Sequence, residues 1–196
     1  MQTMSHKRTR NRRRLALCWG PLLAALTACA EGSNLPPLPD THSAAYHLGV
    51  GDQVRVLTFG EEQLTGEFRI NDSGNIALPL VGALPASGRT TGELSAEIAD
   101  ELRSKKLMRE PSVSVEVMNY RPIFVLGEVS HPGQYPYQPG MTVLTAVTVA
   151  GGFTYRAIKS YGSILRTTNG KAVEGRVSRQ TYVEPGDVIT IYERHF

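Results

Sequence analysis

The sequence holds few of the side chains on which redox, thiolate or metal chemistry depends. Only two of its 196 residues are cysteine and only five are histidine. It contains no Gly-x-Ser-x-Gly motif, no phosphate-binding loop and no Gly-x-Gly-x-x-Gly motif. The histidines, which nowhere pair at the spacing of metal ligands, are His6, His42, His47, His131 and His195. The sequence therefore predicts no catalytic residue, no metal site and no cofactor.

Acidic residues are absent from the first 28 positions, which hold six of the 21 lysines and arginines. The other 15 basic residues are outnumbered by 18 acidic ones, so residues 29–196 carry a net charge of −3 although the whole chain carries +3. Domains that bind nucleic acid carry clustered positive charge. We therefore expect no nucleic-acid partner.

The N-terminal region has the pattern of a secretory leader. Arg12–Arg14 precede an apolar run that ends at Ala28 and is too short to span a bilayer. The segment Leu26-Thr27-Ala28-Cys29 resembles the lipobox of bacterial lipoproteins. That resemblance implies signal cleavage between Ala28 and Cys29 and lipid attachment to the Cys29 thiol, and Ala30 after it implies sorting to the outer membrane. The alternative is ordinary cleavage after Ala30, which would discard Cys29.

The next part of the chain is predicted to form a small α+β unit. Val54 and Val56 alternate with polar residues, as in a half-buried strand. Apolar segments flank the turn Asp72-Ser73-Gly74-Asn75, which favours a hairpin. Thr90 and Glu93 match a capping box before apolar residues at helical spacing. The predicted elements are a strand at 53–56, a hairpin about 72–75, a helix at 91–106 and a strand at 113–117.

A second unit is predicted from Tyr120 onward. Ile123–Leu126 is apolar on both faces, which indicates a central strand. The valines of Thr142–Ala150 would suit a buried strand, but the threonine at its start and the glycines after it favour a short helix. Asn169-Gly170 is a strong hairpin signal, and Val188–Tyr192 is predicted to be the last strand.

Two Gly-Asp pairs open strands in the two units. Gly51-Asp52 and Gly186-Asp187 each precede an apolar segment, so the second pair partly echoes the first. The two aspartates can be imagined as an acid and a base, but aspartate in a turn bonds its own backbone, and the turn interpretation is favoured. Gly151-Gly152 follows an apolar segment instead of opening a helix, so a helix C-cap is favoured over a phosphate cradle.

Taken in order, these segments resemble two bacterial modules. The stretch Tyr46–Val54 resembles the opening of the polysaccharide export domain, and Ile76–Gly82, Thr90–Leu94 and Pro111–Val117 resemble its later motifs. Five later segments resemble the SLBB domain, a β-grasp-like module: 125–129, 132–135, 142–144, 150–154 and 185–189. The turn residues that carry these motifs are Gly51, Asp52, Gly127, Pro132, Gly133, Gly151, Gly152, Gly186 and Asp187.

The resemblance implies an α+β fold with a small polysaccharide export domain followed by a β-grasp-like SLBB domain. The expected organisation is a lipoprotein signal peptide at 1–28, a lipidated tether at 29–45, a polysaccharide export N-terminal domain at 46–119 and an SLBB domain at 120–193. Only Glu193–Phe196 follow the last predicted strand, so the chain resembles the short, xanthan-type exporters.

The resemblance also implies a function. Such proteins are outer-membrane lipoproteins on the periplasmic face that form rings, octameric in the best-known capsule exporter. Capsular polysaccharide or exopolysaccharide passes through the ring, which is coupled to an inner-membrane polysaccharide co-polymerase. The expected protein is therefore not an enzyme, and a separate outer-membrane β-barrel partner is a hypothesis.

Two other functions compete with export. One is a monomeric periplasmic glycan-binding or adaptor module that recruits polymer or partner proteins, and ring assembly distinguishes it from an exporter. The other is a cell-wall glycan hydrolase, which needs a carboxylic acid in an apolar cleft. No glutamate of the sequence stands out for that role.

Overall fold

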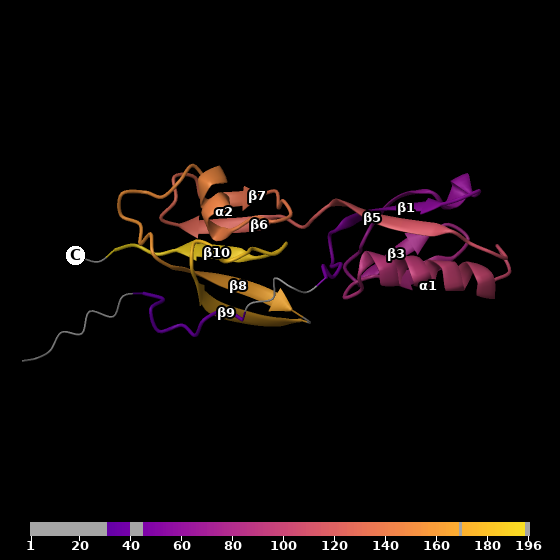
Figure 1. Ribbon diagram of the computed structural model, residues 1–196, viewed down its shortest axis with the longest axis horizontal. Helices are drawn as coiled ribbons and strands as arrows, with labels where there is room; N and C mark the ends of the chain where they lie inside the picture. Colours follow the sequence, from indigo (N-terminus) through magenta and orange to yellow (C-terminus); the bar gives the residue numbers. More distant parts are fainter. Residues whose placement is uncertain (1–30, 40–44, 169, 195–196) are drawn as a thin grey trace, which may run out of the picture.

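The computed structural model describes residues 31–39, 45–168 and 170–194. Two lobes lie end to end along the long axis of the molecule (Figure 1). Each lobe has a buried apolar core of its own, and each combines one α-helix with β-sheet. The predicted α+β fold is therefore confirmed.

The first lobe is built on a three-stranded antiparallel sheet of order β2-β1-β5. Strands β3 and β4 form a separate antiparallel pair. The elements are β1 (Gln53–Thr58), the 3-10 helix η1 (Glu62–Leu64), β2 (Gly66–Arg69), β3 (Asn75–Leu78), β4 (Gly82–Pro85), α1 (Thr91–Ser104) and β5 (Val113–Asn119).

Helix α1 forms where its capping box and apolar spacing predict it. The Thr90 hydroxyl accepts a hydrogen bond from the Glu93 N–H, and the Glu93 carboxylate accepts one from the Thr90 N–H. Leu94, Ile98 and Leu102 are fully buried along one face of the helix. At 14 residues, α1 is the longest helix among the described residues. No helix in this part of the chain is long and apolar enough to cross a membrane.

The predicted hairpin about 72–75 is wrong, although the turn itself is present. The Asn71 side-chain oxygen accepts hydrogen bonds from the N–H groups of Ser73 and Asn75, which closes the turn locally. Strand β2 before the turn pairs with β1, however, and β3 after it pairs with β4. The turn therefore carries the chain from one sheet to another, because β2 pairs back with the preceding strand β1 and β3 pairs forward with the following strand β4.

The second lobe contains a five-stranded mixed sheet of order β7-β6-β10-β8-β9, in which β10 runs parallel to β6. Helix α2 buries Val143, Ala146 and Val147 in the core of this lobe. A mixed sheet with one covering helix agrees with the β-grasp-like expectation. The elements are β6 (Ile123–Gly127), β7 (Gly133–Tyr135), α2 (Val143–Val149), β8 (Gly162–Thr168), β9 (Lys171–Val177) and β10 (Val188–Ile191).

Strand β6 is paired on both edges, as predicted, but only one of its faces is covered. Ile123 and Val125 are fully buried, whereas Phe124 and Leu126 are 37% and 44% exposed. Phe124 and Leu165 flank Val188 across the sheet in direct register. We call these three side chains, on β6, β10 and β8, the open sheet face.

The described residues before the first lobe lie along the second lobe. Residues 31–39, which we call the N-terminal strap, run beside β9, with Pro37 in a parallel bridge to Arg176. The Leu38 side chain packs against the core of the second lobe. The strap is therefore part of the folded structure.

Candidate functional site

The described residues contain no group of three or more His, Cys, Asp or Glu side chains that could hold a metal ion. The sequence positions predicted for lipid attachment and cleavage, Ala28 and Cys29, lie outside the described residues. The site built from the described residues is instead the junction between the lobes, where both Gly-Asp turns meet the linker.

The first turn places a carboxylate in the protein interior. Gly51 has a φ of +94°, which a glycine adopts without strain, and Asp52 after it is fully buried. The Asp52 carboxylate accepts hydrogen bonds from the Gly49 N–H at 2.8 Å and from the Tyr46 hydroxyl at 2.5 Å. Asp52 thus bonds its own turn.

Arg121, in the linker between β5 and β6, binds this carboxylate across the junction. Its backbone N–H donates to Asp52 Oδ1 at 2.9 Å, and its Nε lies 3.6 Å from the same oxygen. Its Nη2 donates to the Tyr46 hydroxyl at 3.3 Å. A Cβ at Gly49 would stand 1.5 Å from Arg121 Nη1, so the absence of a side chain there makes room for the guanidinium.

Aromatic rings continue the junction into the second lobe. Tyr120 makes edge-to-face contacts with Tyr46 and with Tyr137, at centroid distances of 5.1 and 5.3 Å. Burial and the hydrogen bond to Asp52 raise the pKa of the Tyr46 phenol far above its ordinary value. Tyr46 therefore remains a hydrogen-bond donor to Asp52 at physiological pH.

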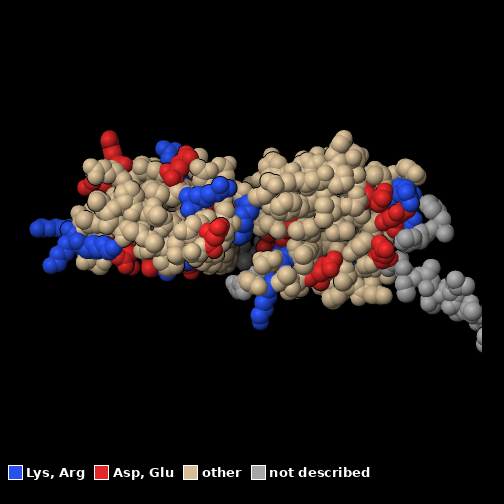
Figure 2. Space-filling model, turned by 180° about the vertical axis from the view of Figure 1, so that it is seen from behind, with Lys and Arg blue, Asp and Glu red and all other residues tan. Residues whose placement is uncertain are grey.

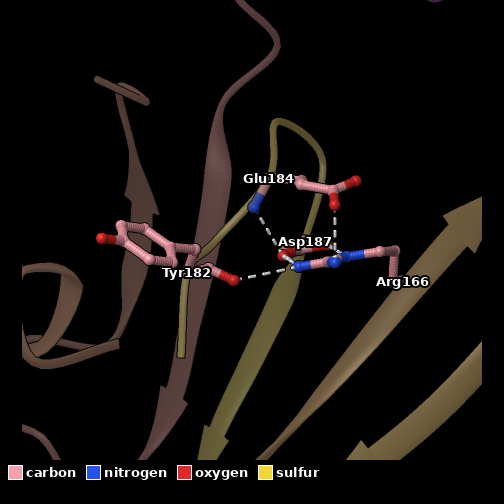
Figure 3. A network of polar contacts seen from close by, with 4 residues as sticks. All are labelled: Arg166, Tyr182, Glu184 and Asp187. Carbon is pink, nitrogen blue, oxygen red and sulfur yellow. Dashed lines mark hydrogen bonds and ion pairs between the residues drawn. The ribbon is translucent and has the colours of Figure 1, made fainter. Parts of the chain in front are cut away.

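The second turn repeats this construction with its own arginine (Figure 3). Arg166 reaches from β8 to the turn before β10 and donates to both oxygens of Asp187, at 2.9 and 2.7 Å. The Asp187 carboxylate also accepts the Glu184 N–H at 2.8 Å, as Asp52 accepts that of Gly49. Burial raises the pKa of Asp187, and the bonds from Arg166 oppose that rise.

Both turns meet at Arg121. The Gly186 N–H donates to the carbonyl of Pro122 at 3.1 Å, and a Cβ at Gly186 would lie 3.7 Å from Arg121 Nε. Each aspartate nevertheless bonds its own turn and its own arginine, so the acceptor sites of both carboxylates are occupied by structural partners. This arrangement supports the turn interpretation over an acid–base pair.

The remaining turn residues of the predicted motifs hold α2 to the strand ends. The Ser130 and His131 N–H groups donate to the carbonyls of Gly152 and Ala150, at the C-terminus of α2. A Cβ at Gly127 would stand 2.0 Å from the Ile191 carbonyl oxygen, so β6 and β10 can meet there only through glycine. Pro132 precedes the short strand β7, and Gly133 is the first residue of that strand.

Neither arginine of the junction could be predicted from the sequence. Arg121 and Arg166 lie 69 and 21 positions from their aspartates, and nothing local distinguishes them from surface arginines. The one available signal was that a buried aspartate requires a cationic or N–H partner. That requirement does not say which of the basic residues supplies it.

Outside this junction, the described residues form a shallow hollow of about 350 Å³ beside Phe59. Its lining residues carry no titratable group, and they are Leu57, Thr58, Phe59, Gly60, Thr65, Ser112 and Ser114. Figure 2 shows basic and acidic side chains interspersed on a largely uncharged face. This pattern lacks the basic stripe of a nucleic-acid-binding surface.

Comparison with known families agrees with this two-lobed architecture. Residues 40–118 match the family described as "Polysaccharide biosynthesis/export protein", and residues 122–163 match the SLBB domain family. The boundary between the two matches falls at the linker that contains Arg121. The family description names polysaccharide biosynthesis and export, which agrees with the export role expected from the sequence.

Curated relatives are similar over most of the chain. The exopolysaccharide production protein ExoF of Rhizobium meliloti (strain 1021) is 37% identical over 150 residues, which cover 71% of this chain and 34% of the relative. The EPS I polysaccharide export outer membrane protein EpsA of Ralstonia nicotianae is 28% identical over 68% of this chain and 37% of its own length. The polysialic acid transport protein KpsD of Escherichia coli is 27% identical over 64% of this chain and 22% of its own length. The chain thus matches about a third or less of each relative's length.

Proposed function

We propose that this chain, which belongs to the polysaccharide export proteins that carry an SLBB domain, is a lipid-anchored subunit of an oligomeric ring at the outer membrane. In this proposal Cys29 carries the lipid, after signal cleavage between Ala28 and Cys29. The ring passes capsular polysaccharide or exopolysaccharide out of the periplasm and works with an inner-membrane co-polymerase.

The observation that carries the proposal is the rigid connection between the export domain and the SLBB domain. A conduit has to keep its subunits in fixed orientation while polymer moves past them. The Asp52–Arg121 contacts and the Tyr46–Tyr120–Tyr137 rings tie the two lobes together without a flexible linker. An adaptor that only recruits polymer has no such requirement.

The open sheet face supplies a surface for subunit contact. Phe124, Val188 and Leu165 lie side by side on three neighbouring strands, and apolar side chains grouped in this way favour burial against a partner. A ring of identical subunits buries such a face against a neighbouring copy by a repeated head-to-tail contact.

The experiment is a mass measurement on the detergent-extracted, lipidated protein by light scattering, with the detergent contribution removed. A closed ring of many subunits is expected. Leu165→Glu should reduce the mass to that of a smaller species, because it places a charge in the subunit contact. Val173→Glu is the matched control: Val173 is 48% exposed on β9 and pairs with Arg166, on the other face of the sheet.

The outcomes separate the two candidate functions. A monomer that stays monomeric when the inner-membrane co-polymerase is added would contradict the ring and favour the glycan-binding or adaptor module. A ring unaffected by Leu165→Glu would keep the proposed function but move the subunit contact away from the open sheet face. Mass spectrometry of the same sample tests the lipid on Cys29 independently.

A further inference from the structure

The N-terminal strap is bound to the second lobe almost up to the proposed lipid attachment. The Tyr161 hydroxyl donates to the Glu31 carbonyl at 3.1 Å. Arg176 Nη1 donates to the Ser33 carbonyl at 3.0 Å, and the Arg176 N–H donates to the Pro36 carbonyl at 2.8 Å. The strap is therefore held at both ends of its described length.

Covalent geometry then limits where the lipid can be. Glu31 is two residues after Cys29, and each residue spans at most about 3.6 Å, so the Cα atoms of Cys29 and Glu31 lie within about 7 Å of each other. A strap bound at Glu31 cannot act as a long flexible leash. The acyl chains must enter the bilayer close to Tyr161.

The surface around this point is the far end of the second lobe. Figure 1 shows the start of the strap, the loop between α2 and β8 and the end of β10 together at the end of the molecule away from the first lobe. The loop is rigid, because Ile158 N–H donates to the Tyr192 carbonyl and Arg194 N–H to the Arg156 carbonyl, both at 2.8 Å. This loop carries Tyr155, which is 81% exposed.

We propose that this end of the second lobe, led by Tyr155, lies against the lipid bilayer, with the first lobe directed away from the membrane. The inference rests on the lipid attachment proposed above. Tyrosine suits the boundary between headgroups and acyl chains, because its ring is apolar and its hydroxyl is polar. Arg156 and Glu193 form an ion pair beside Tyr155, and the Arg194 guanidinium donates a hydrogen bond to the Tyr155 carbonyl, so charged groups suited to the headgroup region surround the ring.

Single tryptophans test this orientation. The one tryptophan of the sequence is Trp19, in the proposed leader, so the mature chain has none and each variant carries a single reporter. Tyr155→Trp places the reporter at the proposed membrane face. Phe59→Trp is the matched control, because Phe59 is 84% exposed and lies in the first lobe. Both side chains are on the surface, so neither change disturbs a core.

Each lipidated variant is reconstituted into phosphatidylcholine vesicles with and without brominated acyl chains. Bromine quenches tryptophan only at contact range, so packing between protein copies does not imitate the signal. We expect Trp emission in Tyr155→Trp to shift to shorter wavelength and to be quenched by brominated lipid, and emission in Phe59→Trp to be unchanged.

Two results would overturn the inference, and they are distinguishable. Acylated protein with no quenching in Tyr155→Trp, or with quenching in Phe59→Trp instead, would refute the orientation and leave the proposed export function intact. Absence of acyl mass on Cys29 would remove the anchor from the proposed function and the orientation with it.

Discussion

The backbone N–H of Arg121 donates a 2.9 Å hydrogen bond to the carboxylate of Asp52, so a turn of the first lobe holds the residue that leads into the second. Asp52 is fully buried, and a buried carboxylate that loses its donors is costly. The lobes therefore cannot swing about this linker without leaving Asp52 short of partners. The junction fixes the direction in which each lobe faces.

Removing the Tyr46 hydroxyl should weaken this junction. Tyr46→Phe keeps the ring that packs against Tyr120 but deletes the 2.5 Å bond to Asp52. Because the acceptor is charged, we expect the free energy of unfolding of the first lobe to fall by about 1.5–3 kcal/mol in urea titrations. Tyr155→Phe, at an exposed hydroxyl, is the control and should change it by less than about 0.5 kcal/mol. Equal effects of the two variants would contradict the role given to Tyr46.

Breaking the second Asp-Arg pair should lower the free energy of unfolding more than Tyr46→Phe does, because both partners are buried. The side chains of Arg166 and Asp187 are 8% and 1% exposed. Arg166→Met leaves the Asp187 carboxylate without its cation, and such a loss costs about 3–5 kcal/mol. Chemical unfolding of the second lobe measures it.

The control for Arg166→Met is Arg179→Met, which changes an exposed arginine of the same lobe and should cost less than about 0.5 kcal/mol. The double variant Arg166→Met/Asp187→Leu should be less destabilised than the sum of its single changes, because no unpaired buried charge remains. A strictly additive double variant would argue that the pair contributes nothing as a pair.

Elements encoded by neighbouring residues could be predicted from the sequence. Helix α1 needs only Thr90, Glu93 and the apolar spacing after them, and it forms over Thr91–Ser104, close to the predicted 91–106. Helix α2 likewise begins at a capping box, of Thr142 and Thr145. Both signals lie within one turn of the helix that they start.

Features that depend on distant partners could not be predicted. The turn at 72–75 gave a correct local signal, but a turn alone does not decide pairing: β2 paired with β1, β3 paired with β4, and the two strands joined different sheets. The bond between Arg121 and Asp52 joins residues 69 positions apart, and no periodicity records it. The docking of the strap on β9 is hidden for the same reason.

The capping box of α1 should make stability depend on pH. The backbone and hydroxyl bonds from Thr90 lower the pKa of the Glu93 carboxylate below its ordinary value. An acid whose pKa is lowered in the folded state stabilises that state above its unfolded pKa, and this contribution is lost as the pH falls through the folded pKa. Thermal unfolding measured from neutral pH down into this acid range should therefore show a smaller pH dependence in Glu93→Gln than in the original protein.

Thr90→Ala provides the companion variant, since it removes the hydroxyl that bonds Glu93. It should reduce the same acid-range dependence and cost about 1 kcal/mol at neutral pH through the lost cap. Thr91→Ala, one residue further on, leaves both cap bonds in place and should retain the full pH dependence. Identical pH profiles for all these variants would show that the cap does not contribute.

Gly175 allows the strap to approach β9, and filling its space should release the strap. A Cβ there would stand 2.6 Å from Leu38 Cα and 2.8 Å from Leu38 N, both backbone atoms that cannot rotate away. In Gly175→Ala we expect fast hydrogen exchange at the Leu38 amide, which otherwise donates to the Arg176 carbonyl at 3.0 Å. Gly92→Ala, where the added Cβ meets open space in α1, should leave that amide protected.

Release of the strap should also loosen the orientation at the membrane. With the strap detached, the chain between the lipid and the first lobe becomes a longer tether, and the second lobe is no longer held at the bilayer. Lipidated Gly175→Ala/Tyr155→Trp should therefore lose much of the brominated-lipid quenching seen in Tyr155→Trp, while Gly92→Ala/Tyr155→Trp keeps it. Quenching that survives after the Leu38 amide has lost its protection would mean that the loop around Tyr155 binds the bilayer without help from the strap.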